Sequence, residues 1–523
     1  MKTTFYTLLF MAVTFLQGQQ PVLVKDINPG ENTGVYSFYY SIPGPHAELN
    51  GKLIFPGITE ENGRELWISD GTEAGTLMIK DIYPGTESSR PQSLMEMEGM
   101  VYFNAENETG WRLYKTDGTP EGTSPIHPDL QVSQFMNPGF LNGKIYIHGE
   151  LADETQEGLW VSDGTEAGTQ FIGDYNIQNF AVLNDKMLFS IFNTEGFSLW
   201  ATDGTAAGTE MIKPGVNLYE TPKLVSGGKL YFTFIDITYG AEPWVTDGTT
   251  DGTFMLKDIY PGEEYGLFGK FIEYNGEVYF SGGITESLWK TDGTETGTIE
   301  VNPNYTYPQI VYNGKLLTSH RENSETGKEL YAFDGTGFEL VKDINPDGSA
   351  RLQNFVGVNG KTWFYGSWHE EDNETSHLWV TDGTEAGTMK IVPDGSTEEE
   401  PLGEDGGFFP IGNTLYFSAN YFPEYGNELY KLDTEALSVE DVVNNQKVKI
   451  YPNPVKDLLN IAFEKEGNHE YSLYSLAGQQ VKSGEFHRKT NQLAVSGLPK
   501  GTYVLKISEK NGKSVSTHKI IVK

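Results

Sequence analysis

Short apolar runs and polar turns alternate along most of this chain, and the pattern repeats every 40 to 51 residues. In one repeat the runs occupy residues 47–49, 52–55, 65–69 and 77–82, and Asn50-Gly51 separates the first two. Runs this short favour β-strands, and Asn-Gly between two of them indicates a hairpin because both residues tolerate positive φ. Each repeat is therefore predicted to form four antiparallel strands.

A second turn, Asp-Gly-Thr-x-x-Gly-Thr, joins the third predicted strand to the fourth. Its aspartates are Asp70, Asp117, Asp163, Asp203, Asp247, Asp292 and Asp382, with worn copies at Asp334 and Asp433. The carboxylate can accept a backbone N–H two residues on, the threonine hydroxyls can close the loop, and Gly71 and Gly75 are expected to have unusual φ. An aspartate present in every repeat serves the repeat rather than one site, so we interpret these residues as structural rather than metal-binding.

A period of 40 to 50 residues built from short strands is typical of a β-propeller with four-stranded blades. The hairpins predict eight or nine blades. The last repeat lacks a fourth strand after residues 428–432, whereas residues 22–27 form an unused one, so we expect these segments to pair and close the ring. The repeated tryptophans are expected to pack between blades: Trp67, Trp160, Trp200, Trp244, Trp289 and Trp379.

Charge limits the classes of partner. The chain has 37 Lys and Arg against 73 Asp and Glu, a formal net charge of -36. Such a surface repels nucleic acids and anionic membranes and attracts cations, among them Ca²⁺. The chain has no cysteine, which excludes disulfides and a cysteine nucleophile.

Composition also divides the chain. Residues 1–18 resemble a secretory signal peptide, and no later stretch has 18 consecutive apolar residues, so we expect no transmembrane segment in the mature protein. Residues 435–523 carry 13 Lys and Arg against 9 Asp and Glu, whereas residues 1–434 carry 24 against 64. We therefore expect a propeller over 21–434, a linker over 435–447 and a second domain over 448–523.

The second domain shows ordered landmarks: Tyr-Pro-Asn-Pro at 451–454, Leu-Leu-Asn-Ile at 458–461, Tyr-Ser-Leu-Ala-Gly at 474–478, Leu-Pro-Lys-Gly-Thr-Tyr at 498–503 and Lys-Ile-Ile-Val-Lys at 519–523. It resembles the type A C-terminal sorting domain of bacterial type IX secretion. That resemblance implies a small β-sandwich that engages the secretion machinery, directs its cargo across the outer membrane and is then removed, leaving the cargo released or attached to the surface. The repeat region resembles exported Bacteroidetes proteins with Glu-Leu-Trp-x-x-Asp-Gly-Thr repeats.

Candidate binding residues lie in the variable loops. Because strands in a blade alternate in direction, the Asn-Gly and Asp-Gly-Thr turns should lie on one face of the ring, here called the turn face. The variable loops should lie on the opposite face, here called the loop face. Function usually resides in such loops. The candidates for ligand contact are Trp368, His369, Tyr421 and Tyr425, and those for binding a cation such as Ca²⁺ are Glu370, Glu371, Asp372, Glu399 and Asp405. A solvated acidic rim, which keeps an exported protein soluble, is the alternative.

The sequence favours an exported binding protein that takes a glycan or protein ligand. It contains no Gly-x-Ser-x-Gly, P-loop or zinc-ligand histidine spacing, and we assign no catalytic residue. Two alternatives stay open: a polysaccharide hydrolase or lyase that uses two loop carboxylates, and a structural surface protein.

Overall fold

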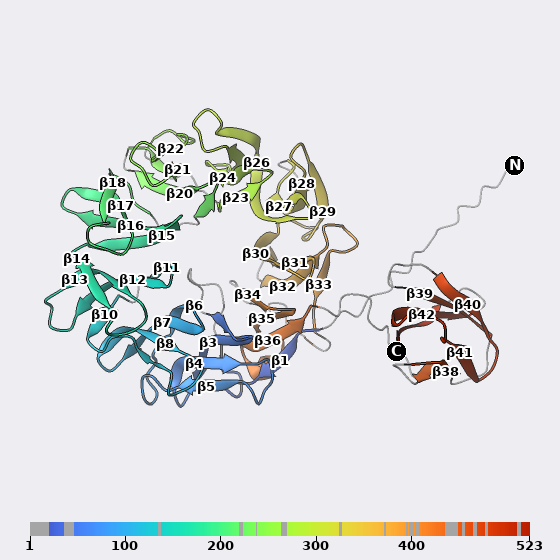
Figure 1. Cartoon of the computed structure of the whole chain (residues 1–523). Coiled ribbons are helices and arrows are strands. Elements are labelled where there is room, and N and C mark those ends of the chain that lie inside the picture. Colours follow the sequence, from blue (N-terminus) through green and yellow to red (C-terminus); the bar gives the residue numbers. More distant parts are fainter. Residues whose placement is uncertain are drawn as a thin grey trace. The chain divides into compact units, whose positions relative to one another are not determined.

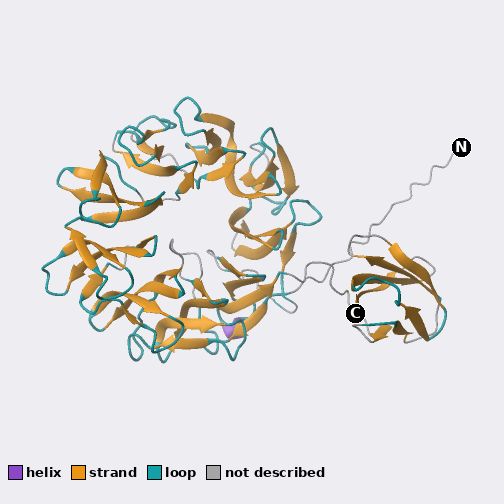
Figure 2. Cartoon of the chain, in the orientation of Figure 1, coloured by secondary structure: helices purple, strands orange, loops and turns teal. Residues whose placement is uncertain are grey.

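The fold is taken from a computed structural model. It describes residues 20–35, 46–133, 137–218, 223–236, 238–262, 269–323, 327–370, 373–393, 396, 402, 407–434, 448–451, 455–463, 468–475, 480–509 and 514–523. The chain divides into two compact units, with residues 20–433 in one and residues 434–523 in the other. The described part is all β apart from one turn of 3₁₀ helix, η1 (Pro423–Tyr425) (Figure 2).

The larger unit contains successive groups of four strands, each an antiparallel meander. The first four groups are β2 (Ala47–Leu49), β3 (Lys52–Thr59), β4 (Gly63–Ser69) and β5 (Leu77–Lys80); β6 (Gln92–Met97), β7 (Met100–Asn107), β8 (Gly110–Thr116) and β9 (Ser124–Pro125); β11 (Gly139–Leu141), β12 (Lys144–Leu151), β13 (Glu157–Ser162) and β14 (Gln170–Gly173), with β10 (Leu130–Val132) also paired to β12; and β15 (Ile177–Leu183), β16 (Lys186–Asn193), β17 (Gly196–Thr202) and β18 (Glu210–Pro214).

The next groups are β19 (Leu224–Ser226), β20 (Lys229–Asp236), β21 (Gly240–Thr246) and β22 (Phe254–Met255); β23 (Ile272–Tyr274), β24 (Glu277–Gly282), β25 (Ser287–Thr291) and β26 (Ile299–Tyr312); β27 (Lys315–His320), β28 (Glu329–Phe333) and β29 (Phe338–Lys342), which also use β26; and β30 (Arg351–Val358), β31 (Lys361–Glu370), β32 (Asn373–Thr381) and β33 (Met389–Ile391). The long strand β26 is therefore the last strand of one group and the first of the next, and it fuses the two into a seven-stranded sheet.

The first and last parts of this unit share one sheet. Strand β1 (Val22–Lys25) pairs antiparallel with β36 (Glu428–Asp433), beside β35 (Thr414–Ala419) and β34 (Phe408–Ile411). This confirms the predicted pairing and makes a ninth group. Figure 1 shows the groups of this unit following one another around a ring, with strands such as β6, β11 and β30 toward its centre and β5, β18 and β29 toward its rim.

The core of this unit lies between neighbouring sheets. One cluster joins Ile54 and Leu66 of the first group to Val101 and Phe103 of the second. The tryptophans follow the same rule, since Trp379 on β32 packs against residues of β27 and β28. The predicted position of the repeated tryptophan between sheets is confirmed there, and the equivalent side chains pack alike: Trp160, Trp200, Trp244 and Trp289.

The smaller unit has two sheets. One contains β37 (Val448–Tyr451), β38 (Leu458–Phe463) and β41 (Thr490–Ala494); the other contains β39 (His469–Ser475), β40 (Gln480–Phe486), β42 (Gly501–Glu509) and β43 (Ser514–Val522). Apolar side chains of both sheets, among them Ile461, Leu473 and Leu505, form one buried core. Searched over its described residues, the chain has no helix of the length and apolarity that a membrane crossing requires.

Candidate functional site

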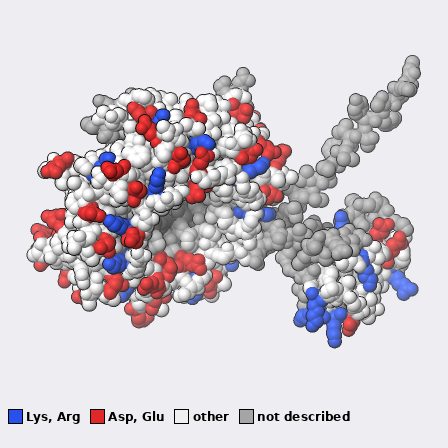
Figure 3. All heavy atoms as spheres, turned by 45° about the horizontal axis from the view of Figure 1, so that its top comes forward, with Lys and Arg blue, Asp and Glu red and all other residues white. Residues whose placement is uncertain are grey.

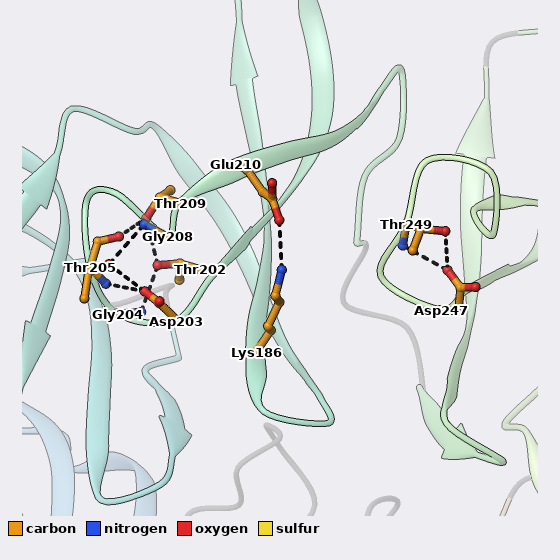
Figure 4. A network of polar contacts seen from close by, with 10 residues as sticks. All are labelled: Lys186, Thr202, Asp203, Gly204, Thr205, Gly208, Thr209, Glu210, Asp247 and Thr249. Atoms are coloured by element: carbon orange, nitrogen blue, oxygen red, sulfur yellow. Dashed lines mark hydrogen bonds and ion pairs between the residues drawn. The ribbon is translucent and has the colours of Figure 1, made fainter.

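The turn at Asp203 shows how the turn face is built (Figure 4). Oδ1 of Asp203 accepts the backbone N–H and the hydroxyl of Thr205, both at 2.8 Å. The Thr205 hydroxyl oxygen accepts the Gly208 N–H at 3.0 Å, and the Thr209 hydroxyl donates to the Thr205 carbonyl oxygen at 2.7 Å. The two bonds to the carboxylate, led by that from the Thr205 hydroxyl, lower the pKa of Asp203. The turn is thus held by its own side chains, as predicted.

Glycine is needed twice in this turn, for two different reasons. Gly204 has a φ of 88°, which only glycine adopts readily. Gly208 has no positive φ, and a Cβ there would overlap the Asp203 carboxylate. The expectation of unusual φ is therefore right for Gly71 and wrong for Gly75, where close approach of the carboxylate is the physical reason. Each other complete turn has the same aspartate bonds and the same second glycine: Asp70, Asp117, Asp163, Asp247, Asp292 and Asp382.

The worn turn at Asp334 is shorter. Its carboxylate accepts the N–H groups of Thr336 and Gly337 and the Thr336 hydroxyl. These bonds lower the pKa of Asp334 to about 2. A Cβ on Gly337 would meet nothing within 4 Å. This turn lies in the seven-stranded sheet, so the irregular turn and the irregular sheet occur together.

Lysines tie most of the complete turns to the preceding sheet. Lys431 Nζ donates to the Gly71 carbonyl oxygen at 2.6 Å, and Lys115 Nζ donates to that of Gly164 at 2.8 Å. Lys80 Nζ likewise reaches the Thr123 carbonyl oxygen at 2.7 Å. Backbone carbonyl groups of the turns thus accept hydrogen bonds from lysines of the neighbouring sheet and join the two sheets.

Four buried glutamates hold the chain segments that connect one sheet to the next. Glu65 is fully buried at the start of the third strand of its group. Its carboxylate accepts the N–H groups of Ile82, Tyr83 and Ser89 at 2.9, 3.3 and 3.0 Å, and the Ser89 hydroxyl at 2.5 Å. Since unpaired buried N–H groups are costly, this single side chain fixes the path of the connecting segment.

The same arrangement recurs wherever the connection reads Lys-Asp-Ile. The glutamates and the backbone donors they accept are Glu242 with Ile259 and Tyr260, Glu329 with Ile344 and Asn345, and Glu428 with Ile27 and Asn28. Burial raises the pKa of each of these glutamates to about 7, against the opposing effect of the N–H donors. This role of the glutamates was not predicted, although the glutamate and the Lys-Asp-Ile segment occur in the same four repeats and could have indicated it.

Most candidate cation ligands fall outside the described part of the chain. Glu371, Asp372, Glu399 and Asp405 lie there, and Glu370 ends strand β31. Trp368 and His369 belong to the same strand, paired with Thr375 and Glu374 of β32. Over the described residues, no three His, Asp or Glu side chains gather in a way that could hold a metal ion. A calcium site at these loops stays a prediction.

The two tyrosine candidates lie in different surroundings. Tyr421 is fully buried, and its ring contacts that of Tyr430 with centroids 5.1 Å apart. The expectation that Tyr421 contacts a ligand on the loop face is therefore corrected, because its aromatic ring is part of the core. Tyr425 is half-buried on η1, next to Phe422.

The acidic loops are partly engaged in local bonds. Glu106 pairs with Arg90 at 2.9 Å, and Asp153 accepts the N–H and hydroxyl of Thr155. Acidic side chains nevertheless dominate the charged surface of the larger unit in Figure 3, whereas Lys and Arg gather on the smaller unit.

Exposed apolar side chains occur at the loop-face ends of three successive groups. Phe192, Tyr239 and Ile284 expose 47%, 43% and 68% of their surface, although large apolar side chains are usually buried. Phe192 also contacts Phe197 across its hairpin, with ring centroids 4.7 Å apart. Phe192 lies near the end of β16, and Tyr239 and Ile284 follow β20 and β24, so the three residues line one arc of the ring.

A cationic cluster, consisting of Tyr305, Arg321 and Lys328, follows on that arc. Tyr305 is in β26, Arg321 comes directly after β27, and Lys328 directly before β28. Lys328 Nζ lies 3.5 Å from the centre of the Tyr305 ring, and the Arg321 N–H donates to the Tyr305 carbonyl oxygen at 3.0 Å. Arg321 Nε is buried without a hydrogen-bond partner among the described residues. In this cluster the Lys328 ammonium group thus lies against the Tyr305 ring, and Arg321 Nε has no acceptor among the described residues.

The surroundings of the cluster hold it in place. His320, buried beside Arg321, lies 2.8 Å from the Thr306 hydroxyl and stacks on Phe338 with ring centroids 4.0 Å apart. Burial lowers the pKa of His320, which favours the neutral ring. Burial likewise lowers the pKa of Lys328, with the charge of Arg321 acting the same way and that of Glu286 against it. Neither Arg321 nor Lys328 forms an ion pair with another described residue, although the charge of Glu286 acts on Lys328 from farther away.

Known structures resemble the chain only distantly. The chain is 13% identical to PorZ, a bacterial surface component of the type IX secretion system of Porphyromonas gingivalis, over 91% of this chain and 75% of that one, with a TM-score of 0.25. It is 12% identical to the extracellular domain of the two-component system BT4673 from B. thetaiotaomicron, over 95% and 76% of the two chains, with a TM-score of 0.30. A puromycin-hydrolysing peptidase of Mycobacterium tuberculosis is 13% identical over 77% and 61%, with a TM-score of 0.38. Scores this low support no functional argument.

The C-terminal residues give a specific match. No curated protein matches the chain. Residues 449–523 match the family model described as the secretion system C-terminal sorting domain, and they form most of the smaller unit. The chain therefore ends in a type IX sorting domain, which directs the protein to the cell surface or into the medium.

Proposed function

We propose that this protein is an exported, non-enzymatic β-propeller that binds a glycan through its loop face. In this proposal residues 1–18 are a signal peptide, residues 21–434 form nine blades with Glu-Leu-Trp-x-x-Asp-Gly-Thr-type repeats, residues 435–447 are a linker, and residues 448–523 are the sorting domain. The pairing of β1 with β36 supports a closed ring, since it leaves the first and last strands in one sheet.

One observation carries the binding role: the two faces of the ring use their side chains differently. On the turn face, aspartates such as Asp203 bond within their own turns. On the loop face, Phe192 and Tyr239 are exposed, and Arg321 Nε has no acceptor among the described residues. Aromatic faces combined with polar donors suit sugar rings and their hydroxyl groups.

The hydrolase or lyase alternative requires two carboxylates that flank a scissile bond. The carboxylates with strongly raised pKa values, Glu65, Glu242, Glu329 and Glu428, are buried and bond backbone N–H groups. This favours a structural role for them and gives the enzymatic alternative no support.

The test is a glycan array probed with the purified full-length protein, together with a polysaccharide hydrolysis screen. We expect retention of glycans without reducing-end release. Release of sugars would replace the proposal with the enzymatic alternative, and retention of no glycan would contradict it.

A further inference from the structure

We propose that Arg321 and Lys328 bind the anionic groups of an acidic polysaccharide at the loop face. This inference rests on the proposed function and specifies its ligand class. The shared chemistry is a carboxylate or sulfate ester repeated along a sugar chain.

The position of the two cations follows from the register of the fused sheet. Thr306 of β26 lies opposite His320 of β27, and His320 lies opposite Glu329 of β28. The residues one step beyond these pairs, Tyr305, Arg321 and Lys328, therefore share the end of the sheet at the loop face. Regular backbone pairing thus brings residues 305, 321 and 328 together.

The two cations are ready to accept an anion. The Tyr305 ring restricts the Lys328 ammonium group at 3.5 Å, so little side-chain freedom is left to lose on binding. Among the described residues none accepts a hydrogen bond from the buried Nε of Arg321, and guanidinium groups bind carboxylates and sulfates through paired N–H donors. The charges of Arg321 and Lys328 repel each other, Glu286 offsets part of this repulsion, and a bound anion would offset more of it.

The overall negative charge does not prevent such binding. At physiological ionic strength the Debye length is about 8 Å, so distant carboxylates are largely screened and the local pair decides. Glu286 and Glu322 are the acidic neighbours: Glu286 acts on Lys328, and Glu322 lies 3.5 Å from His320. Their charges limit the affinity for a single anion, which favours a ligand with a repeated charge.

The exposed apolar residues Phe192, Tyr239 and Ile284 favour a polysaccharide over an acidic peptide as the ligand. Phe192 and Tyr239 are exposed aromatic rings at the loop-face ends of two groups that precede the cluster along the chain. Flat aromatic surfaces suit the faces of pyranose rings, whereas acidic peptides present flexible charged side chains. A chain of sugars crossing this arc would meet aromatic surface first and positive charge next.

The experiment measures the affinity of the full-length protein for polygalacturonate, dextran sulfate, neutral dextran and poly-L-glutamate by calorimetry. The double substitution Arg321→Gln with Lys328→Gln should lower the affinity for the acidic polysaccharides roughly tenfold or more, as expected for lost charge-assisted hydrogen bonds. Polygalacturonate and dextran sulfate distinguish carboxylate from sulfate recognition. Unchanged melting temperatures verify that the variant is folded.

The matched control is Lys186→Gln, which removes one exposed charge that pairs with Glu210 near the turn face (Figure 4). It should leave every affinity unchanged. Equal affinity of the wild type and the double variant for acidic polysaccharides would overturn this inference while leaving glycan binding in place. Equally tight, cluster-dependent binding of poly-L-glutamate would overturn the polysaccharide assignment, and binding of no polysaccharide at all would overturn the proposed function itself.

Discussion

The turn face and the loop face lie at opposite ends of the strands, and at both faces side chains form hydrogen bonds with backbone groups of the connecting segments. At the turn face, seven turns repeat the same bonds, from Asp70 to Asp382. At the loop face, Glu65 and its three equivalents fix the connections of four groups, while the other groups have different residues at that position, such as Arg112 and His377. Residues that recur in every repeat therefore have a structural role. Binding residues are expected where a repeat departs from the common pattern.

The fused sheet is the largest departure. Its strand β26 serves two groups, its turn at Asp334 is shortened, and the cationic cluster lies at its loop end.

The largest effect should come from the glutamate that holds the N-terminal strand. Glu428→Ala leaves the N–H groups of Ile27 and Asn28 buried without an acceptor, at about 1–3 kcal/mol each. We expect a loss of about 2–6 kcal/mol in the free energy of unfolding, measured by urea denaturation. The exposed Glu424→Ala is the control, and equal effects of the two would disprove the role of Glu428.

The free energy of unfolding should depend on pH differently in the wild type and in the Glu242→Gln variant. Because the folded-state pKa is raised to about 7, the stability linked to its protonation is fully present below about 4.5 and is lost as pH rises to 7. The wild type should therefore lose stability relative to Glu242→Gln by up to roughly 1.4 kcal/mol per pH unit in that range.

Burial also lowers the pKa of His377, to about 4, and that of His148, and these histidines make stability depend on pH, but they are common to both proteins. Their contribution therefore cancels in the difference. A difference between wild type and Glu242→Gln that does not vary with pH would contradict the raised pKa.

Two alanine substitutions compare the complete turn with the worn one. Gly208→Ala should destabilise by about 1–3 kcal/mol, because its Cβ overlaps the Asp203 carboxylate. Gly337→Ala should be close to neutral, since nothing lies within 4 Å of its Cβ and its φ is not positive. Thermal unfolding measures both, and a costly Gly337→Ala would show that the short turn is as constrained as the long one.

The smallest effect concerns a single turn aspartate. Asp163 is exposed, and its bonds to Thr165 compete with water. Asp163→Ala should therefore lower the free energy of unfolding by only about 0.5–1.5 kcal/mol. Glycan affinity, measured where the ring stays folded, should not change; a loss of affinity without a change in melting temperature would contradict the scaffold role of the turn face.

The sequence predicted what depends on neighbouring residues. Asn50-Gly51, with φ of 52° and 77°, has the expected hairpin conformation, and the pairing of β1 with β36 followed from a missing strand. The role of Gly75 was misassigned, because a close approach of side chains leaves no mark in backbone propensity. Among the binding candidates, Tyr421 proved to be buried.

The missed features depend on distant residues. Glu428 and Ile27 are 401 positions apart, so their bond requires the folded ring. The cationic cluster joins Tyr305, Arg321 and Lys328 through the register of β26, β27 and β28. No single motif includes these residues, and their repeat is the one whose pattern is worn.

The most direct test of the difference between the two faces is hydrogen exchange of the full-length protein with and without saturating polygalacturonate. Bound ligand should slow exchange at residues 283–286 and 320–323 of the loop face, and leave residues 203–209 and 247–253 of the turn face unchanged. Protection at the Asp203 and Asp247 turns, with none around Arg321, would contradict the account.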